Sequence, residues 1–359
     1  YAYDHREDWT DNWSARCYCQ DNPEAEDCSL TESIDPGVCQ GLKNSFGDNY
    51  RWNHDGDREP WRLAGNSGTT LCMDLNNDGF LDLFTNEIVH GDVGSSSDPS
   101  EILVNTGEAD VRFERPGPEA TGVHREHPPF TYWDHGDMTS EVLDFDNDGL
   151  LDIYNSSLGR DLMVLAQPDG SWVDATEELG LTHEWGVSGL RNQWSPMFLD
   201  LNADGRLDLY VRQGGMGVGG AVLGADSGPH LAFNERDVLY LGTAEGRFER
   251  VLPPHHPVVA TMGRHGVAGD GDNDGVPDMA HGGDQGSAGY WHNETEVSDG
   301  GRALTVRFDS TVSGWPPTGA QIEATCDGQT LRRTLTSGGL MGATRAAELY
   351  LGWPTCASE

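Results

Sequence analysis

One nine-residue motif, written four times, constrains the fold of this chain more than any other feature. Each copy has the form D-x-[DN]-x-D-G-x-x-D, and we name the copies loop 1 (74–82), loop 2 (144–152), loop 3 (200–208) and loop 4 (270–278). Oxygen-bearing side chains stand at positions one, three, five and nine. The glycine at position six permits a sharp turn that directs the carbonyl of position seven inward. Because Ca²⁺ prefers about six to eight oxygen ligands, each copy predicts a calcium-binding loop.

The predicted calcium ligands are four side chains and one backbone carbonyl in each loop. In chain order they are Asp74, Asn76, Asp78, Phe80, Asp82, Asp144, Asp146, Asp148, Leu150, Asp152, Asp200, Asn202, Asp204, Arg206, Asp208, Asp270, Asp272, Asp274, Val276 and Asp278. We therefore expect about four Ca²⁺ ions per chain. Loop 4 departs from the pattern at position eight, where Pro277 replaces the leucine of the other three loops.

The flanking residues distinguish these loops from EF-hands. An EF-hand has a glutamate at position twelve and a helix on each side. Position twelve is here Thr85, Asn155, Val211 or His281. The segments that follow the loops are short, apolar and alternating, which is typical of strands. Each loop is therefore predicted to join two β-strands.

The spacing of the loops predicts a repeat architecture. Their first aspartates are separated by 70, 56 and 70 residues, and outer strands are expected between them, for example at 161–166 and 170–173. Such a unit has the size of a propeller blade of about four strands. Because one unit cannot bury both of its apolar faces, units must stack side by side. The predicted fold is all-β, a calcium-loop β-propeller of about five to seven blades, four of them with visible calcium loops.

Two family resemblances agree with this architecture. The four loops and the outer strands after them resemble the FG-GAP/VCBS repeats of integrin-like β-propellers. Residues 318–325, 330–339 and 348–352 resemble the ASPIC/UnbV module, which follows such repeats in the cartilage-acidic-protein-like family. The resemblances cover roughly residues 64–356. They imply a calcium-loaded propeller, commonly of about seven blades, whereas the visible loops leave the number of blades open.

The chain is expected to contain three regions. These are a cysteine-rich N-terminal cap (1–45), an FG-GAP/VCBS-type propeller (46–300) and an ASPIC/UnbV-like β segment (301–359). The last region contains four candidate strands, which either stand apart as one set or complete the propeller.

The seven cysteines favour an oxidising compartment. A polar, turn-rich stretch that cannot build a core alone is typical of a disulfide-stapled cap. The N-terminal cap (1–45) is such a stretch, and its four cysteines are Cys17, Cys19, Cys28 and Cys39. Cys326 and Cys356 are candidates for closing the C-terminal region, and Cys72 is expected to be a buried free thiol. Since extracellular calcium concentrations fill such loops readily, we expect a secreted, extracellular or periplasmic protein.

The charge of the chain excludes some classes of partner. There are 60 acidic and 22 basic residues, and the net charge is −38. Nucleic-acid-binding proteins are basic, so that class is excluded, and binding to anionic membrane surfaces is disfavoured. No run of about twenty apolar residues is present, so no membrane span is expected. Because the clustered carboxylates repel one another without metal, calcium is expected to matter for stability.

Residues that enter the strands before the loops predict a ligand site at one mouth of the propeller. The ligand-binding candidates are Gln193, Trp194 and Arg264. A tryptophan that stacks and an arginine that pairs with acidic groups suit a carbohydrate or a carboxylated ligand. The catalytic candidates at the same mouth are His135, Asp137, Arg191 and His265.

Three functions remain open at the level of sequence. The first is a recognition or adhesion module for a protein or glycan, with structural calcium. The second is an enzyme that acts on a polysaccharide or small molecule through the histidine and arginine rim, and the third is a matrix protein that uses its acidic surface. A transition-metal site of His124 or His127 with His135 is a further hypothesis. The sequence does not predict the oligomeric state.

Overall fold

The structure of the protein is a computed structural model. It describes residues 67–87, 100–123, 137–157, 161–182, 193–214, 237–251, 262–284, 288–309, 317–336 and 347–357. The predicted N-terminal cap, with its four cysteines, lies outside the described residues. No helix in the described part of the chain is long and apolar enough to cross a membrane.

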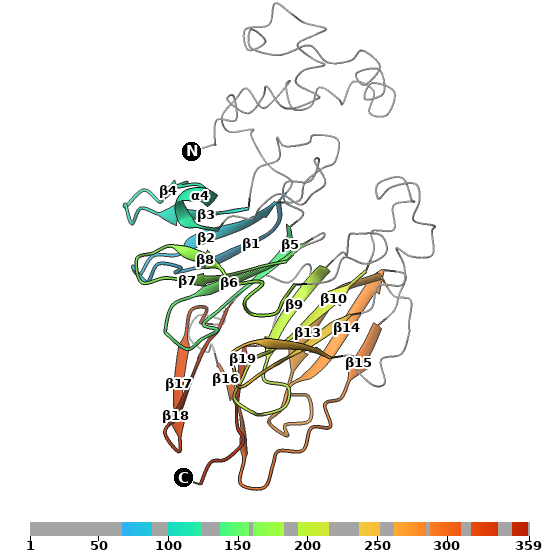
Figure 1. Ribbon diagram of the computed structural model, residues 1–359. Helices are drawn as coiled ribbons and strands as arrows, with labels where there is room; N and C mark the ends of the chain where they lie inside the picture. Colours follow the sequence, from blue (N-terminus) through green and yellow to red (C-terminus); the bar gives the residue numbers. More distant parts are fainter. Residues whose placement is uncertain are drawn as a thin grey trace, which may run out of the picture.

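The described residues form an almost purely antiparallel β structure (Figure 1). The first sheet contains β1 (Ser67–Met73), β2 (Asp82–Glu87), β3 (Glu101–Asn105) and β4 (Phe113–Glu114). The second contains β5 (Asp137–Leu143), β6 (Asp152–Ser157), β7 (Leu162–Ala166) and β8 (Trp172–Asp174). The third contains β9 (Gln193–Leu199), β10 (Asp208–Gln213), β11 (Val238–Gly242) and β12 (Phe248–Val251). The fourth contains β13 (Met262–Gly269), β14 (Asp278–Asp284) and β15 (Ala288–Trp291), and one short helix, α4 (Pro118–Thr121), follows the first sheet.

Each motif loop is the turn between the first two strands of a sheet, as predicted. The residue before the loop pairs with the last aspartate of the loop in all four sheets. The pairs are Met73 with Asp82, Leu143 with Asp152, Leu199 with Asp208 and Gly269 with Asp278. The four loops therefore occupy the same place and the same register in four successive sheets.

The sheets are arranged side by side through their first strands. β1 contacts β5, β5 contacts β9, and β9 contacts β13 (Figure 1). The hydrophobic core is accordingly divided into clusters that lie between neighbouring sheets. This all-β arrangement is consistent with a β-propeller-like fold, and it shows why one sheet alone would leave apolar faces exposed.

The alternation of side chains along a strand explains how one sheet contributes residues to two of these clusters. In β9, Phe198 packs with the second sheet, whereas Met197 and Leu199 pack towards the fourth. Successive side chains of a strand point to opposite faces of the sheet. All seven residues of β9 are buried, so a strand between two neighbours needs apolar residues on both faces.

The C-terminal region differs from the single four-stranded set expected from sequence. β16 (Arg302–Arg307) pairs with β19 (Glu348–Trp353), and β17 (Gln321–Cys326) forms a separate hairpin with β18 (Gln329–Thr334). A disulfide between Cys326 and Cys356 links the end of the hairpin to the residues after β19. The two pairs share a small core, and the pairing of β16 with β19 could not be predicted because it joins strands distant in sequence.

Cys72 is free, as predicted, but it is only partly buried in β1. Burial, followed by the negative charge of Asp82, raises the pKa of its thiol. The expectation of a fully buried thiol was therefore wrong. The strand face that carries Cys72 is not completely covered by the described residues.

Candidate metal centres

The four motif loops have the same backbone conformation. Position six is a glycine with φ between 87° and 96°, a region that other residues rarely adopt. Position four also has a positive φ in every loop, at Asn77 (59°), Asn147 (62°), Ala203 (55°) and Asn273 (65°). Pro277 therefore does not alter the turn of loop 4. Two left-handed residues in six turn the chain back on itself, so that the side chains at positions one, three and five can approach one point.

Backbone amides orient the first and last carboxylates of each loop. In loop 3, Asp200 accepts hydrogen bonds from the N–H groups of Asp204 and Gly205, both at 3.0 Å. Asp208 accepts one from the N–H of Leu201 at 3.0 Å and one from Gly242, at the end of β11, at 2.9 Å. The bond from position six to position one, and both bonds to position nine, recur in the other three loops. The last aspartate thus connects the loop to the third strand of its sheet or, in loop 4, to the residue Asn293 after that strand.

The carboxylates nearest the sheets are buried. The exposed fraction is 1% for Asp152 and 0% for Asp208, and burial raises the pKa of both carboxyls to about 7. Burial also raises the pKa of Asp144 and Asp200 to about 6. A buried carboxylate is costly unless it is paired with a cation. Loops 2 and 3 therefore hold buried carboxylates whose negative charge a divalent cation would neutralise.

Loop 4 stabilises its last carboxylate differently. Burial acts to raise the pKa of Asp278, but hydrogen bonds from the Tyr290 hydroxyl and from the N–H groups of Asn293 and Gly271 leave the pKa below its usual value. His292 adds a further contact, with its Nδ1 3.2 Å from Asp278. Tyr290 and His292 belong to or follow β15, so the third strand of this sheet supports the loop with side chains as well as with backbone.

The oxygen atoms of two loops already lie close enough to share an ion. One carboxylate oxygen each from Asp144, Asp146 and Asp152 lies within 4.8 Å of the others, and the same holds for Asp270, Asp272 and Asp274. Loops 1 and 3 have an asparagine at position three, and thus one carboxylate fewer. In loop 2, Asp144 Oδ1 is buried and accepts no hydrogen bond. An oxygen-only donor set with an unpartnered carboxylate oxygen fits a hard cation such as Ca²⁺.

Two glycine substitutions at position six separate the effect of the positive φ from the effect of close packing against a neighbouring backbone. Gly79→Ala is expected to cost about 1–2 kcal/mol of unfolding free energy, because φ is +90° and no atom lies within 4 Å of the added Cβ. Gly205→Ala should cost about 1–3 kcal/mol more, because its Cβ would lie 2.8 Å from the carbonyl oxygen of Gly352. Denaturant unfolding of both variants in calcium measures the difference. Equal losses would contradict the packing of the C-terminal region on loop 3.

The opposite ends of the same strands carry a second group of buried polar residues. Arg212 and Asp237 form an ion pair in which the side chains are only 1% and 3% exposed. The hydroxyl of Tyr210 and the N–H of Gln213 also donate to Asp237. The carboxylate of Asp237 therefore holds the end of β10 to the start of β11. At about 3.3 Å per residue, β9 separates this end of the sheet from loop 3 by ~20 Å.

Two of the predicted ligand-binding residues contact each other here. The guanidinium of Arg264 lies 3.9 Å from the ring centroid of Trp194. Both side chains donate a hydrogen bond to the carbonyl of Gly214, at 2.8 Å and 2.6 Å. Trp194 is 3% exposed, so a ligand that stacked on this ring would first have to displace Arg264.

Gln193, the third ligand-binding candidate, lies opposite Gln213 in the register of β9 and β10. Both side chains are completely buried, and neither the oxygen nor the nitrogen of either amide has a hydrogen-bond partner. Buried amides without partners are rare, because each missing hydrogen bond costs about 1–3 kcal/mol. The pair offers donors and acceptors that a polar ligand or ordered water can satisfy.

The structure describes only two of the four catalytic candidates, Asp137 and His265. His135 and Arg191 lie outside the described residues, as do His124 and His127. Asp137 is buried at the start of β5, and its carboxylate accepts a hydrogen bond from Ser100 at 2.5 Å. His265 lies half-buried in β13. The described residues therefore do not test whether the four candidates converge, and their grouping stays a prediction.

Gln213, Arg212 and Asp237 were not singled out from sequence. Their position relative to the motif could have indicated them. Gln213 stands five residues after the last aspartate of loop 3, as Glu87 stands five residues after the last aspartate of loop 1. Comparison of these equivalent positions identifies the strand end where buried polar residues collect.

Comparison with known proteins supports the repeat. The family model for FG-GAP-like repeats matches residues 144–211, from loop 2 to β10. No curated protein matches the chain. Among solved structures, the chain is similar to Zg3597, a family 117 glycoside hydrolase produced by the marine bacterium Zobellia galactanivorans. The identity is 12% and the TM-score 0.32, over 82% of this chain and 88% of that one.

Proposed function

We propose that this protein is a calcium-stabilised β-propeller that recognises a glycan or protein ligand. The observation that carries the calcium part is the fourfold repetition of one loop conformation with the same hydrogen bonds to the first and last aspartates. A Ca²⁺ ion in each loop would be held by positions one, three, five and nine and the carbonyl of position seven, about four ions per chain. Each ion would add positive charge among the carboxylates of its loop.

The role of calcium in this proposal is structural. The loop joins the first two strands of its sheet, and the aspartate at position nine accepts hydrogen bonds from the loop and from the third strand or the residues after it. A cation that fixes this carboxylate therefore stabilises three strands at once. The carboxylates would otherwise repel one another within one loop.

The proposal includes a division of the chain and a location. The division comprises a cap (1–45), the propeller (46–300) and an ASPIC/UnbV-like β segment (301–359), of which the last contains the two C-terminal strand pairs. The Cys326–Cys356 disulfide supports an oxidising compartment, either extracellular or periplasmic. Free calcium is abundant outside the cell, where weak calcium loops are filled.

We place the ligand at the end of the sheets opposite the loops. Gln193 and Gln213 provide unpartnered amides there, and Arg264 provides a guanidinium group at the same end, whereas the charge of Arg212 is balanced by Asp237. Amides and guanidinium groups bind the hydroxyl and carboxylate groups of sugars. These residue types favour an acidic glycan among the ligands that the proposal admits.

Replacing one buried amide tests this assignment. Screening the calcium-loaded protein against acidic polysaccharides should identify a binder, and Gln213→Leu should weaken its binding at least tenfold. The variant removes two unpartnered polar atoms, so its unfolding free energy should be unchanged or higher. Gln167→Leu is the matched control, because Gln167 lies in the β7–β8 turn and its side-chain nitrogen donates to the nearby carbonyls of Leu165 and Ala166. Unchanged binding by Gln213→Leu would place the ligand elsewhere.

No second function is proposed. The enzyme hypothesis names His135, Asp137, Arg191 and His265, of which His135 and Arg191 lie outside the described residues. The transition-metal hypothesis names His124, His127 and His135, which also lie outside them. Within the described part of the chain, Asp137 is already engaged by Ser100. No observation there favours catalysis over recognition.

A further inference from the structure

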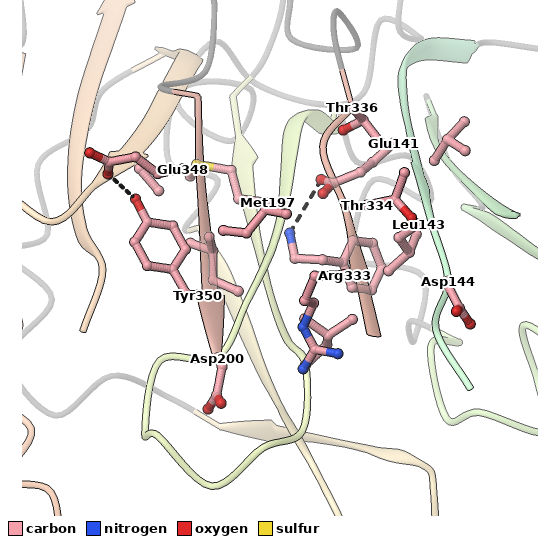
Figure 2. A pocket seen from close by; sticks show the side chains of 16 residues that line it. Glu141, Leu143, Asp144, Met197, Asp200, Arg333, Thr334, Thr336, Glu348 and Tyr350 are labelled. Carbon is pink, nitrogen blue, oxygen red and sulfur yellow. Dashed lines mark hydrogen bonds between the residues drawn. The ribbon is translucent and has the colours of Figure 1, made fainter. Parts of the chain in front are cut away.

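The C-terminal strand pairs contact three of the four motif loops. Figure 1 shows the β17–β18 hairpin below the second sheet and the β16–β19 pair between this hairpin and the third and fourth sheets. Figure 2 shows the space between them, a cavity of about 60 Å³ lined by residues of β5, β9, β18 and β19. Asp144 and Asp200, the first residues of loops 2 and 3, lie at its edge. The C-terminal region therefore packs directly against these loops.

Loop 2 is held by the hairpin through the residue at position four. The side-chain oxygen of Asn147 accepts hydrogen bonds from the N–H of Arg332 at 2.9 Å and from the Arg333 guanidinium at 3.3 Å. The carbonyl of Asn147 accepts one from the Arg332 guanidinium at 2.7 Å. Asn147 makes these three bonds in its left-handed conformation, with both its carbonyl and its side-chain oxygen facing β18.

Loop 3 is held through positions four and six. The carbonyl of Gly205 accepts a hydrogen bond from the Arg333 guanidinium at 3.1 Å. Gly352 of β19 packs so closely on Ala203 that an added Cβ would lie 2.4 Å from the backbone of that residue. Arg333 therefore joins two loops at once, and it lies between Asp144 and Asp200 in Figure 2. Only 7% of Arg333 is exposed.

Loop 4 is held by the other strand pair. Thr305 donates a hydrogen bond to Asp270 Oδ2 at 3.0 Å, and Arg307 donates one to the carbonyl of Asp270 at 3.1 Å. Glu348 accepts from the N–H of Asp270 at 3.3 Å and pairs with Arg307. These contacts converge on the first residue of the loop, which is itself a predicted calcium ligand.

Loop 1 has none of these contacts with the described C-terminal strands. Its residues 76–81 are exposed, although its backbone conformation is the same as that of the other loops. The difference shows that the contacts of loops 2, 3 and 4 are a property of the C-terminal region and are not required by the motif itself.

We propose that the C-terminal region is a calcium-dependent clasp, which docks on loops 2, 3 and 4 when they hold calcium and detaches when calcium is removed. The proposal rests on calcium binding by these loops. The docking atoms belong to positions one, four and six, whose arrangement depends on the loop keeping its turn around an ion. Without the ion, repulsion among the carboxylates opens the loop and moves these atoms away from β18 and β16.

Hydrogen exchange of the intact, disulfide-bonded chain tests the clasp. Amides of residues 321–334 should exchange at least about 100-fold faster in chelator than in calcium, because a two-stranded hairpin is marginal alone. The amides of residues 162–165 in β7, which belong to a complete sheet, serve as the reference and should change less; Ala166 is left out because its N–H donates to Asp152. Bound calcium is counted in the same samples. If calcium leaves and residues 321–334 stay as protected as before, the clasp is refuted; if no calcium binds at all, the proposed function fails first.

A matched pair of variants tests the same point in the presence of calcium. Asn147→Gly keeps the left-handed turn but removes the side-chain oxygen that accepts from Arg332 and Arg333. Asn77→Gly makes the same change at the same position of loop 1, which lacks the C-terminal contact. Residues 321–334 should exchange at least about tenfold faster in the first variant only. Equal exchange in the two variants would overturn the role of Asn147 in docking.

Discussion

Excess chelator is expected to lower the thermal unfolding midpoint of this protein by at least about 10 °C. A ligand present at 100 times its dissociation constant contributes about 2.7 kcal/mol per site, and the chain has four motif loops. In domains of 150–250 residues, 1 kcal/mol shifts the midpoint by about 2–4 °C, and the shift per kcal/mol is smaller for longer chains. Scanning calorimetry of the same sample in calcium and in chelator measures the effect.

The cation used to restore stability provides the control. Ca²⁺ added back after chelation should recover the midpoint, whereas Mg²⁺ should recover little, because it requires near-octahedral geometry at about 2.0–2.1 Å and retains its water. Salt at matched ionic strength should also recover little, because screening is not coordination. Recovery by salt alone would mean that calcium acts by screening charge repulsion in the loops and is not coordinated by them.

Asp208→Ala is expected to remove one bound calcium ion and to lower the unfolding free energy by about 3–5 kcal/mol. Asp208 is 0% exposed, and its two oxygens accept hydrogen bonds from the N–H groups of Leu201 and Gly242. Alanine leaves both amides without partners, each at a cost of about 1–3 kcal/mol, and also removes a metal ligand. Denaturant unfolding together with a metal count on the same preparation checks both parts.

Asp110→Ala is the matched control for this substitution. Asp110 is exposed between β3 and β4, so its loss should change stability by no more than about 0.5 kcal/mol and leave the metal count unaltered. If Asp208→Ala is destabilised but binds as much calcium as the parent protein, Asp208 only holds the strands together. The assignment of position nine as a ligand would then be wrong.

The part of the fold that sequence predicted is the part encoded locally. The motif fixes a turn by its own residues, with an oxygen at every second position and a glycine at position six, so both the loop and the strands beside it could be identified. The junction of Leu199 with Asp208 follows from the turn alone. The outer strand β7 was predicted because its apolar run is bounded by turn residues.

The features that sequence did not predict depend on residues far apart in the chain. The contact of Arg333 with Asn147 joins residues 186 positions apart, and no local pattern indicates it. The pairing of β16 with β19, in place of one four-stranded set, also depends on packing against loops 3 and 4. Similarly, Gln213 became a site candidate only when the register placed it opposite Gln193. In each case the tertiary contact, rather than the strand propensity, decides the outcome.

The most direct test of the account is a count of calcium ions on the folded chain by native mass spectrometry. We predict about four ions on the parent protein, and one fewer on each of Asp82→Ala, Asp152→Ala, Asp208→Ala and Asp278→Ala. Each variant changes the last aspartate of a different loop, so the four losses report the four sites separately. A folded parent protein that carries no calcium at millimolar concentration, or variants that lose none, would contradict the assignment of the four loops as metal centres.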